Sequence, residues 1–98
     1  MSDISHWDGN GITDGQFSYP GAIDTDSQSN IYVIDTGNHR IQEFTKDGTF
    51  VSKWGRQGFD KGQLVHPSGI AVDPQGHVFV SDSGKNTIQE YAVMNAVR

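Results

Sequence analysis

The 98-residue sequence contains no cysteine, which excludes disulfide bridges, cysteine-ligated zinc and thiol catalysis. Leucine occurs once, against eight isoleucines and eight valines. β-Branched residues favour strands, whereas leucine is common in helices. No apolar run approaches the roughly 18 residues of a membrane span, and the opening residues have neither the basic nor the apolar region of a signal peptide. With twelve glycines in addition, the composition predicts one small all-β domain that is cytoplasmic or of unknown location.

An internal repeat with a period of 47 residues runs through the sequence. Shifting the chain against itself by this period aligns residues 4–44 with residues 51–91 without a gap and gives 15 identities in 41 pairs. Chance would give about two or three, so the chain is a duplication. Trp7 falls on Trp54, and Asp35 falls on Asp82.

Each copy predicts short strands separated by turn residues such as Asp-Thr-Gly and Lys-Asp-Gly. The expected strands are Gly21–Thr25, Asn30–Ile34, His39–Thr45 and Thr49–Trp54, then Gly69–Val72, His77–Ser81 and Thr87–Val93, with Ile4–Trp7 as the counterpart of Thr49–Trp54. Stacked four-stranded sheets at this period are typical of β-propeller blades. We therefore expect one blade over residues 8–54, three strands of a second over 55–93, and a tail over 94–98.

The stretch Asn30–Phe44, with Asn38-His39-Arg40-Ile41 at its centre, resembles the NHL repeat, which is named for an Asn-His-Leu motif. The stretch Pro67–Asp82 resembles the opening of the next such repeat, although Lys85-Asn86-Thr87 stands where the first copy has Asn38-His39-Arg40. The resemblance implies a β-propeller of six blades in a ring. It also implies a binding role, which in some members of the family is RNA binding.

Two blades cannot close on themselves, so the sequence favours a ring of three chains in which residues 1–7 complete the last blade of a neighbour. The residues expected at this interface are Ile4, Ser5, His6, Trp7, Ile88, Tyr91 and Val93. Met1 just ahead of the spare strand favours this interpretation. The alternative is that the chain is a two-blade fragment of a larger NHL protein.

Catalysis and metal binding find little support in the sequence. Lyases of the NHL type bind zinc through a histidine directly after the proline of the first strand, and Gly21 and Ser68 stand there. Glu43 and Glu90 occupy equivalent positions and so do not form an acid–base pair in unlike environments; solvated or cross-strand structural roles are expected for them. The polar segment 24–35 does not have the residue pattern of a calcium loop. The four histidines do not have the spacing of metal ligands. One exception stays open, namely that three copies of His66 meet on a threefold axis. We expect no cofactor and no metal.

The sequence favours a non-catalytic scaffold that binds a protein or small molecule along one edge. The residues expected to contact this ligand are Asn38, His39, Arg40, Arg56, Phe59, His66 and Lys85. Nucleic acid is disfavoured because the formal charge is −5 per chain. Three alternatives stay open: a lectin-like ring that stacks sugars on Trp7 or Trp54, an RNA-binding propeller, and a residual hydrolase or lyase.

Overall fold

The computed structural model describes residues 14–92, which form seven β-strands and one turn of 3₁₀-helix. The strands are β1 (Pro20–Thr25), β2 (Ile31–Asp35), β3 (Arg40–Phe44), β4 (Phe50–Trp54), β5 (Pro67–Val72), β6 (His77–Asp82) and β7 (Thr87–Ala92), and the turn is η1 (Thr36–Asn38). The strand expected at Ile4–Trp7, the interface residue Val93 and the tail over 94–98 lie outside the described residues.

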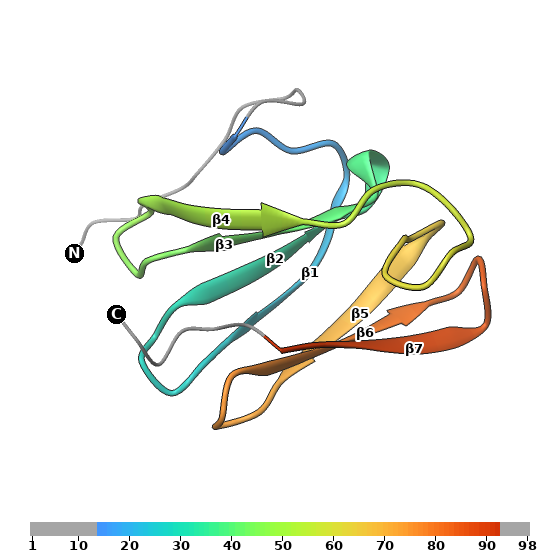
Figure 1. Cartoon of the computed structure of the whole chain (residues 1–98). Helices are drawn as coiled ribbons and strands as arrows, with labels where there is room; N and C mark the ends of the chain where they lie inside the picture. Colours follow the sequence, from blue (N-terminus) through green and yellow to red (C-terminus); the bar gives the residue numbers. More distant parts are fainter. Residues whose placement is uncertain (1–13, 93–98) are drawn as a thin grey trace.

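Two antiparallel sheets make up the fold (Figure 1). Sheet 1 has the order β1-β2-β3-β4, and sheet 2 has the order β5-β6-β7. The expected all-β fold and its strands are confirmed for the described residues, with bounds that differ by no more than two residues. Both inner strands, β1 and β5, carry a register shift at the same repeat position, just after Pro20 and Pro67.

Aspartate side chains form the tight turns after β1 and β5. The Asp26 carboxylate accepts the backbone N–H of Gln28 at 2.9 Å and of Asn30 at 3.0 Å. Partial burial acts to raise the pKa of Asp26, but hydrogen bonds from Asn30 and Tyr32 outweigh it and hold the pKa below its usual range. Asp73 makes the equivalent turn through the N–H of Gln75 and His77. The polar segment after Asp24 is therefore a hairpin turn, as its sequence predicts.

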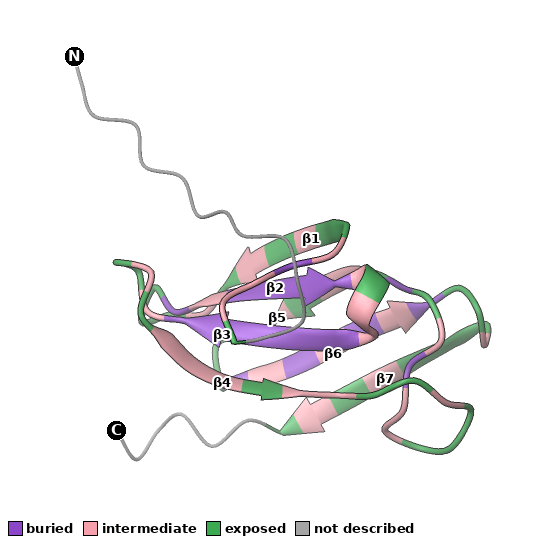
Figure 2. Ribbon diagram, turned by 90° about the horizontal axis from the view of Figure 1, so that it is seen from above, coloured by how far each residue is buried: buried purple, intermediate pink, exposed green. Residues whose placement is uncertain are grey.

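The main hydrophobic core lies between the two sheets. It joins Tyr32, Ile34 and Ile41 of sheet 1 to Val78 and Val80 of sheet 2, together with Leu64 of the connecting loop; all six are fully buried. Strands β2 and β3 are buried almost along their whole length (Figure 2). A second cluster of Phe17, Val33 and Phe44 covers the other face of sheet 1.

Trp54 packs between the sheets. Its ring lies edge-on to Tyr32 at 6.2 Å and to Tyr91 at 5.9 Å, measured between centroids. Its indole nitrogen is buried without a hydrogen-bond partner among the described residues. The aromatic surface of Trp54 is thus used for packing rather than offered as a sugar-stacking platform. Tyr91, expected at an interface between chains, takes part in this packing within one chain.

Hydrogen bonds join the sheets around the contact of β1 with β5 (Figure 1). Thr36 Oγ1 donates to the Pro67 carbonyl at 3.0 Å, and His39 Nδ1 donates to the Val65 carbonyl at 2.7 Å. The Val72 N–H donates to Asp24 Oδ2 at 2.8 Å. These bonds fix the register of one sheet on the other.

Candidate binding rim

One edge of the molecule gathers the turn over residues 36–39, the loop over residues 55–66 and the turn over residues 83–86; we call this edge the loop rim (Figure 1). Buried aspartates at the ends of β2 and β6 hold it in place. Asp35 accepts the N–H of Ser18 at 2.7 Å, and Asp82 accepts the N–H of Val65 at the same repeat position at 2.8 Å. Asp82 also accepts the N–H of Gly84 at 3.1 Å. These aspartates therefore hold the entry loops as well as the turns that follow them.

The pKa of Asp82 reflects these contacts. Partial burial acts to raise the pKa, but backbone hydrogen bonds from His66, Val65 and Gly84 outweigh it and lower the pKa below its ordinary value. Because the carboxylate is ionised, each of its bonds is charge-assisted. Asp82 therefore anchors the segment that leads into β5.

Gln42 and Gln89 fasten the same segments from β3 and β7. Gln42 accepts the N–H of Gly15 at 2.9 Å and donates to the Gln16 carbonyl at 2.7 Å. Gln89 accepts the N–H of Gly62 at 2.7 Å and donates to the Gln63 carbonyl. This role was not predicted from the sequence, although the identity of the two glutamines at equivalent positions of the repeat is a signal of it.

Arg40 and Lys85 hold equivalent carbonyl groups from different repeat positions. Arg40 is buried, pairs with Asp35 at 2.8 Å and donates to the Gln16 carbonyl at 2.9 Å. Lys85 donates to the carbonyls of Asp60 and Gln63, each at 2.9 Å. Both cations were expected to contact a ligand, and both make structural contacts within the chain.

The structure brings together the seven residues expected to contact a ligand, but at different depths. Asn38 donates to Asp35 and His39 to Val65, and both are half-buried. Arg56, Phe59 and His66 are exposed, and Phe59 has an exposed fraction of 76%. Of the seven residues, these three have the accessible side chains.

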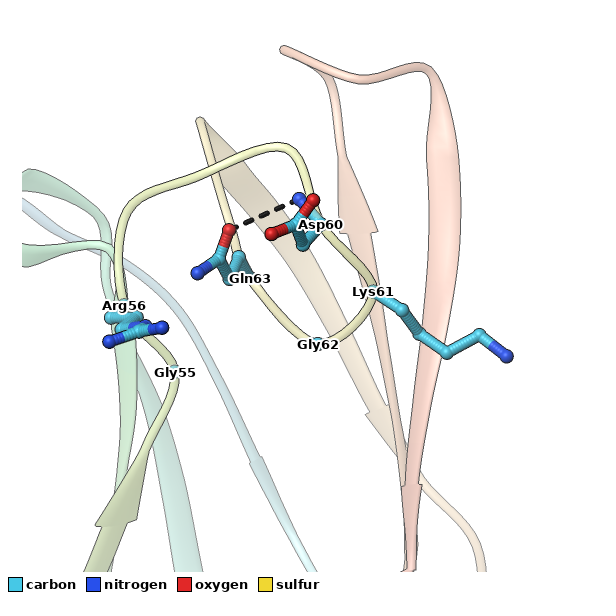
Figure 3. Close-up of a pocket in the computed structure, with 6 residues that line it drawn as sticks. All are labelled: Gly55, Arg56, Asp60, Lys61, Gly62 and Gln63. Atoms are coloured by element: carbon cyan, nitrogen blue, oxygen red, sulfur yellow. Dashed lines mark hydrogen bonds between the residues drawn. The ribbon is translucent and has the colours of Figure 1, made fainter.

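A shallow hollow of about 470 Å³ lies under the loop that follows β4, lined by Gly55, Arg56, Asp60, Lys61, Gly62 and Gln63 (Figure 3). Gln63 folds back across it and accepts the N–H of Asp60 at 3.1 Å. The Lys61 side chain points away from the hollow (Figure 3). Asp35 and Asp82 are buried and add no exposed negative charge to this edge. The exposed charged groups of the loop are the cations Arg56 and Lys61 and the carboxylate of Asp60.

Other candidate chemistry is placed elsewhere. Glu43 is fully buried and accepts the Ser52 hydroxyl at 3.0 Å across β3 and β4, whereas Glu90 is exposed; the pair shows one cross-strand and one solvated glutamate. Among residues 14–92, no three histidine or carboxylate side chains group closely enough to hold a metal ion. Over the same range no helix is long and apolar enough to cross a bilayer.

The chain has two stacked antiparallel sheets related by a 47-residue repeat. In each sheet an aspartate and a glutamine at equivalent repeat positions hold the entry loop. These features define a β protein built from repeated blades. The family model of the NHL repeat matches residues 17–44 and 64–91, which is more than half of the sequence. The chain therefore belongs to the NHL repeat family, as its motifs indicate.

Two curated relatives are similar to part of the chain. One is the protein named brain tumor of Drosophila melanogaster, and the other is the B-box type zinc finger protein ncl-1 of Caenorhabditis elegans. Each is 48% identical over 40 residues, a stretch that covers 41% of this chain. The same stretch covers 4% of the fly protein and 5% of the nematode protein, so this chain matches a small part of either relative.

Proposed function

We propose that the chain is a non-catalytic β-propeller module that assembles as a ring of three copies and binds a protein partner through the loop rim. The observation that carries the binding role is Phe59, a large apolar side chain exposed on a loop that Lys85, Gln89 and Asp82 hold in place. Exposed aromatic and arginine side chains on a preorganised surface are typical of protein interfaces. A loop that is already ordered loses little entropy when it binds.

The partner proposed here is a protein segment with an apolar side chain for Phe59 and carboxylates for Arg56 and Lys61. His66 lies at the start of β5 on the same edge and is also exposed. Asn38, His39, Arg40 and Lys85 position the loops in this proposal and are not primary contacts, because their polar groups bond within the chain.

The ring is supported by the edge of β7, which pairs with β6 alone among the described residues. In sheet 1 the corresponding strand β3 pairs with β4, with Ile41 opposite Trp54 and Glu43 opposite Ser52. By the repeat we expect the same register on β7, with Trp7 of a neighbour opposite Ile88 and Ser5 opposite Glu90. In this arrangement residues 1–7 complete the neighbour's blade, and residues 8–54 and 55–93 are the two blades of one chain.

Light scattering after gel filtration tests the ring. We expect the intact chain to have a mass near three copies, about 32 kDa, and a chain that starts at Asp8 to fall to one copy. A monomeric intact chain with unchanged stability after truncation would contradict the ring and would favour a fragment of a larger propeller.

Selection of displayed random peptides tests the loop rim. We expect the selected peptides to be acidic and to lose at least tenfold in affinity for Phe59→Ala and Arg56→Ala, because hot-spot truncations cost more than about 1.4 kcal/mol. Lys46→Ala is the matched control, since Lys46 is exposed in the β3–β4 turn at the opposite edge. Equal losses in all three variants, or peptides without carboxylates, would contradict the assignment.

A further inference from the structure

The outer face of sheet 2 carries apolar side chains that no described residue covers. Ser81 is paired with Ile88 and Phe79 with Glu90 across β6 and β7, so these four side chains share a face, opposite to the one that packs on sheet 1. The exposed fraction of Ile88 is 73%. A hollow of about 510 Å³ opens in this face, lined by Ser68, Ser81, Asp82, Ser83, Asn86, Thr87 and Ile88.

The same place on sheet 1 is filled within the chain. The 47-residue shift maps Ser81 and Ile88 onto Ile34 and Ile41, which are fully buried in one cluster with Leu64. It maps Ser83 and Asn86 onto Thr36 and His39, whose side chains bond the carbonyls of Pro67 and Val65. On sheet 1, therefore, the segment over residues 64–67 occupies the position that is hollow on sheet 2.

The segment with the matching sequence position is residues 17–20 at the entrance to sheet 1. Phe17 takes the place of Leu64 and is larger, whereas Ser81 takes the place of Ile34 and is smaller. The two changes are opposite in sign, so the larger Phe17 partly compensates for the smaller Ser81, which is the direction of size change that a core tolerates best. A partner of unrelated sequence would have no reason to match the size of this hollow.

The outer face of sheet 1 supplies the rest of a complementary surface. Phe17 is packed on it against Val33 and Phe44 and keeps 9% of its surface exposed, whereas Ile23 is exposed there with a fraction of 63%. Val33 and Ile23 correspond to Val80 and Ile70, which already pack against sheet 1 inside the chain. Each chain thus carries both halves of one contact, as a head-to-tail assembly requires.

We propose that the hollow around Ser81 packs over Phe17 of a second copy, with Asn86 bonding the carbonyl of that copy's Ser18. Ser83 donates to the His66 carbonyl of its own chain at 3.2 Å, and in the assembly it exchanges this bond for one to the carbonyl of that copy's Pro20. This inference rests on the proposed ring. It adds the contact between Phe17 and the hollow around Ser81, which we call the seat and which determines which sheet faces meet between copies. The ring then has two kinds of junction, Ile34 with Leu64 inside each chain and Ser81 with Phe17 between chains.

A size swap tests the proposal. Ser81→Ile fills the hollow, and Phe17→Leu leaves it underfilled, so each single change should raise the concentration of half-assembly at least tenfold in sedimentation equilibrium. The double variant recreates the pair found inside the chain and should return to within about threefold of the native value, a coupling between contacting residues. Phe59→Leu, on the loop rim, is the control and should leave assembly unchanged.

Additive weakening in the double variant would overturn the seat while leaving the ring intact. A native chain that is monomeric at every concentration would instead refute the ring proposal, and the seat with it.

An engineered disulfide gives a second measurement that does not depend on the folding of Phe17→Leu. Because the sequence has no cysteine, Ser18→Cys combined with Asn86→Cys should link copies head to tail on oxidation. Bands at two and three chain masses on a non-reducing gel are expected, whereas each single-cysteine variant can give only pairs. A product that remains at one chain mass would contradict the seat.

Discussion

Arg40 and Lys85 show how two copies of a repeat keep a contact while changing the residue that makes it. Gln16 and Gln63 occupy the same repeat position, and each carbonyl accepts a hydrogen bond from a cation. Arg40 stands two positions later in its copy than Lys85 does in the other. The departure of the second copy from the Asn-His-Arg pattern therefore preserves the anchoring of the loop, and a long flexible lysine reaches the carbonyl from the turn itself.

Removal of the Lys85 cation should loosen the loop before β5. We expect Lys85→Ala to lower the free energy of unfolding by about 1 kcal/mol, since a hydrogen bond to a partly exposed charged group is lost. Thr87→Arg in that background should recover most of the loss, because residue 87 corresponds to Arg40 and lies opposite Asp82 in the sheet register. Urea denaturation measures both variants, and an arginine at 87 that gives no recovery would contradict the equivalence.

Among residues 14–92, His77 is a group whose titration near neutral pH is perturbed by its surroundings. A hydrogen bond from its Nδ1 to Asp73 at 2.9 Å, followed by the charge of Asp73, raises the pKa of His77 above 6.5. Since the folded-state pKa is the higher one, the stabilisation is complete below about pH 6.5 and is lost as the pH rises through the folded value.

The stability difference between the native chain and His77→Asn should therefore shrink with rising pH. Asparagine is the conservative choice because Asn30 holds the equivalent position. NMR titration of the imidazole should also show a lower midpoint in Asp73→Asn. An unchanged midpoint in that variant would show that Asp73 does not set the pKa.

The loop over residues 55–66 acts as an element of the core as well as of the loop rim. Leu64 is fully buried between the sheets, while Phe59 five residues earlier is exposed. Leu64→Ala should cost about 2–5 kcal/mol of unfolding free energy, the usual range for a buried leucine, whereas Phe59→Ala should change it by less than about 0.5 kcal/mol. Chemical denaturation compares the two, and similar effects would mean that the loop packs differently from this description.

The strands were predictable because their signals are local. Alternation places Ile31 and Val33 on one face and Tyr32 on the other, and the structure confirms both assignments. The turns around Asp26 and Gly48 follow from aspartate hydrogen bonding and from the positive φ of 93° at Gly48. Residues 30–44 therefore fold much as their sequence predicts.

Depth of burial was not predictable in the same way. Arg40 is charged and Gln42 polar, yet both lie in the interior because they satisfy backbone groups of a loop about 25 residues earlier in the chain. Such pairings depend on how the entry loop folds back over the sheet, and no local pattern encodes that path. The comparison of the two copies was the available signal, since it singles out Asp35, Asp82, Gln42 and Gln89 as unchanged.

Among the described residues, sheet 2 is covered on the face that packs on sheet 1 but not on its other face, which carries the exposed Ile88. Association that covers the second face should stabilise the folded chain by mass action. The melting temperature should then rise with protein concentration, and Ile88→Lys should abolish this dependence without lowering the melting temperature of the dilute chain, because Ile88 is exposed there. Calorimetry over a hundredfold range of concentration checks the expectation, and a flat melting temperature for the native chain would contradict it.

The unequal pairs Ile34 with Leu64 and Ser81 with Phe17 also bear on what happens when defective copies are present. In the proposed ring each chain contributes two sheets, so that the Ile34–Leu64 and Ser81–Phe17 junctions alternate. A truncated product that contains only sheet 1 would present a Phe17 surface that fits the hollow around Ser81 of another chain. Its Ile34 surface would not fit Phe17 of the next chain, so assembly would stop there. Such a product should act as a poison subunit, with a dominant-negative effect at substoichiometric amounts.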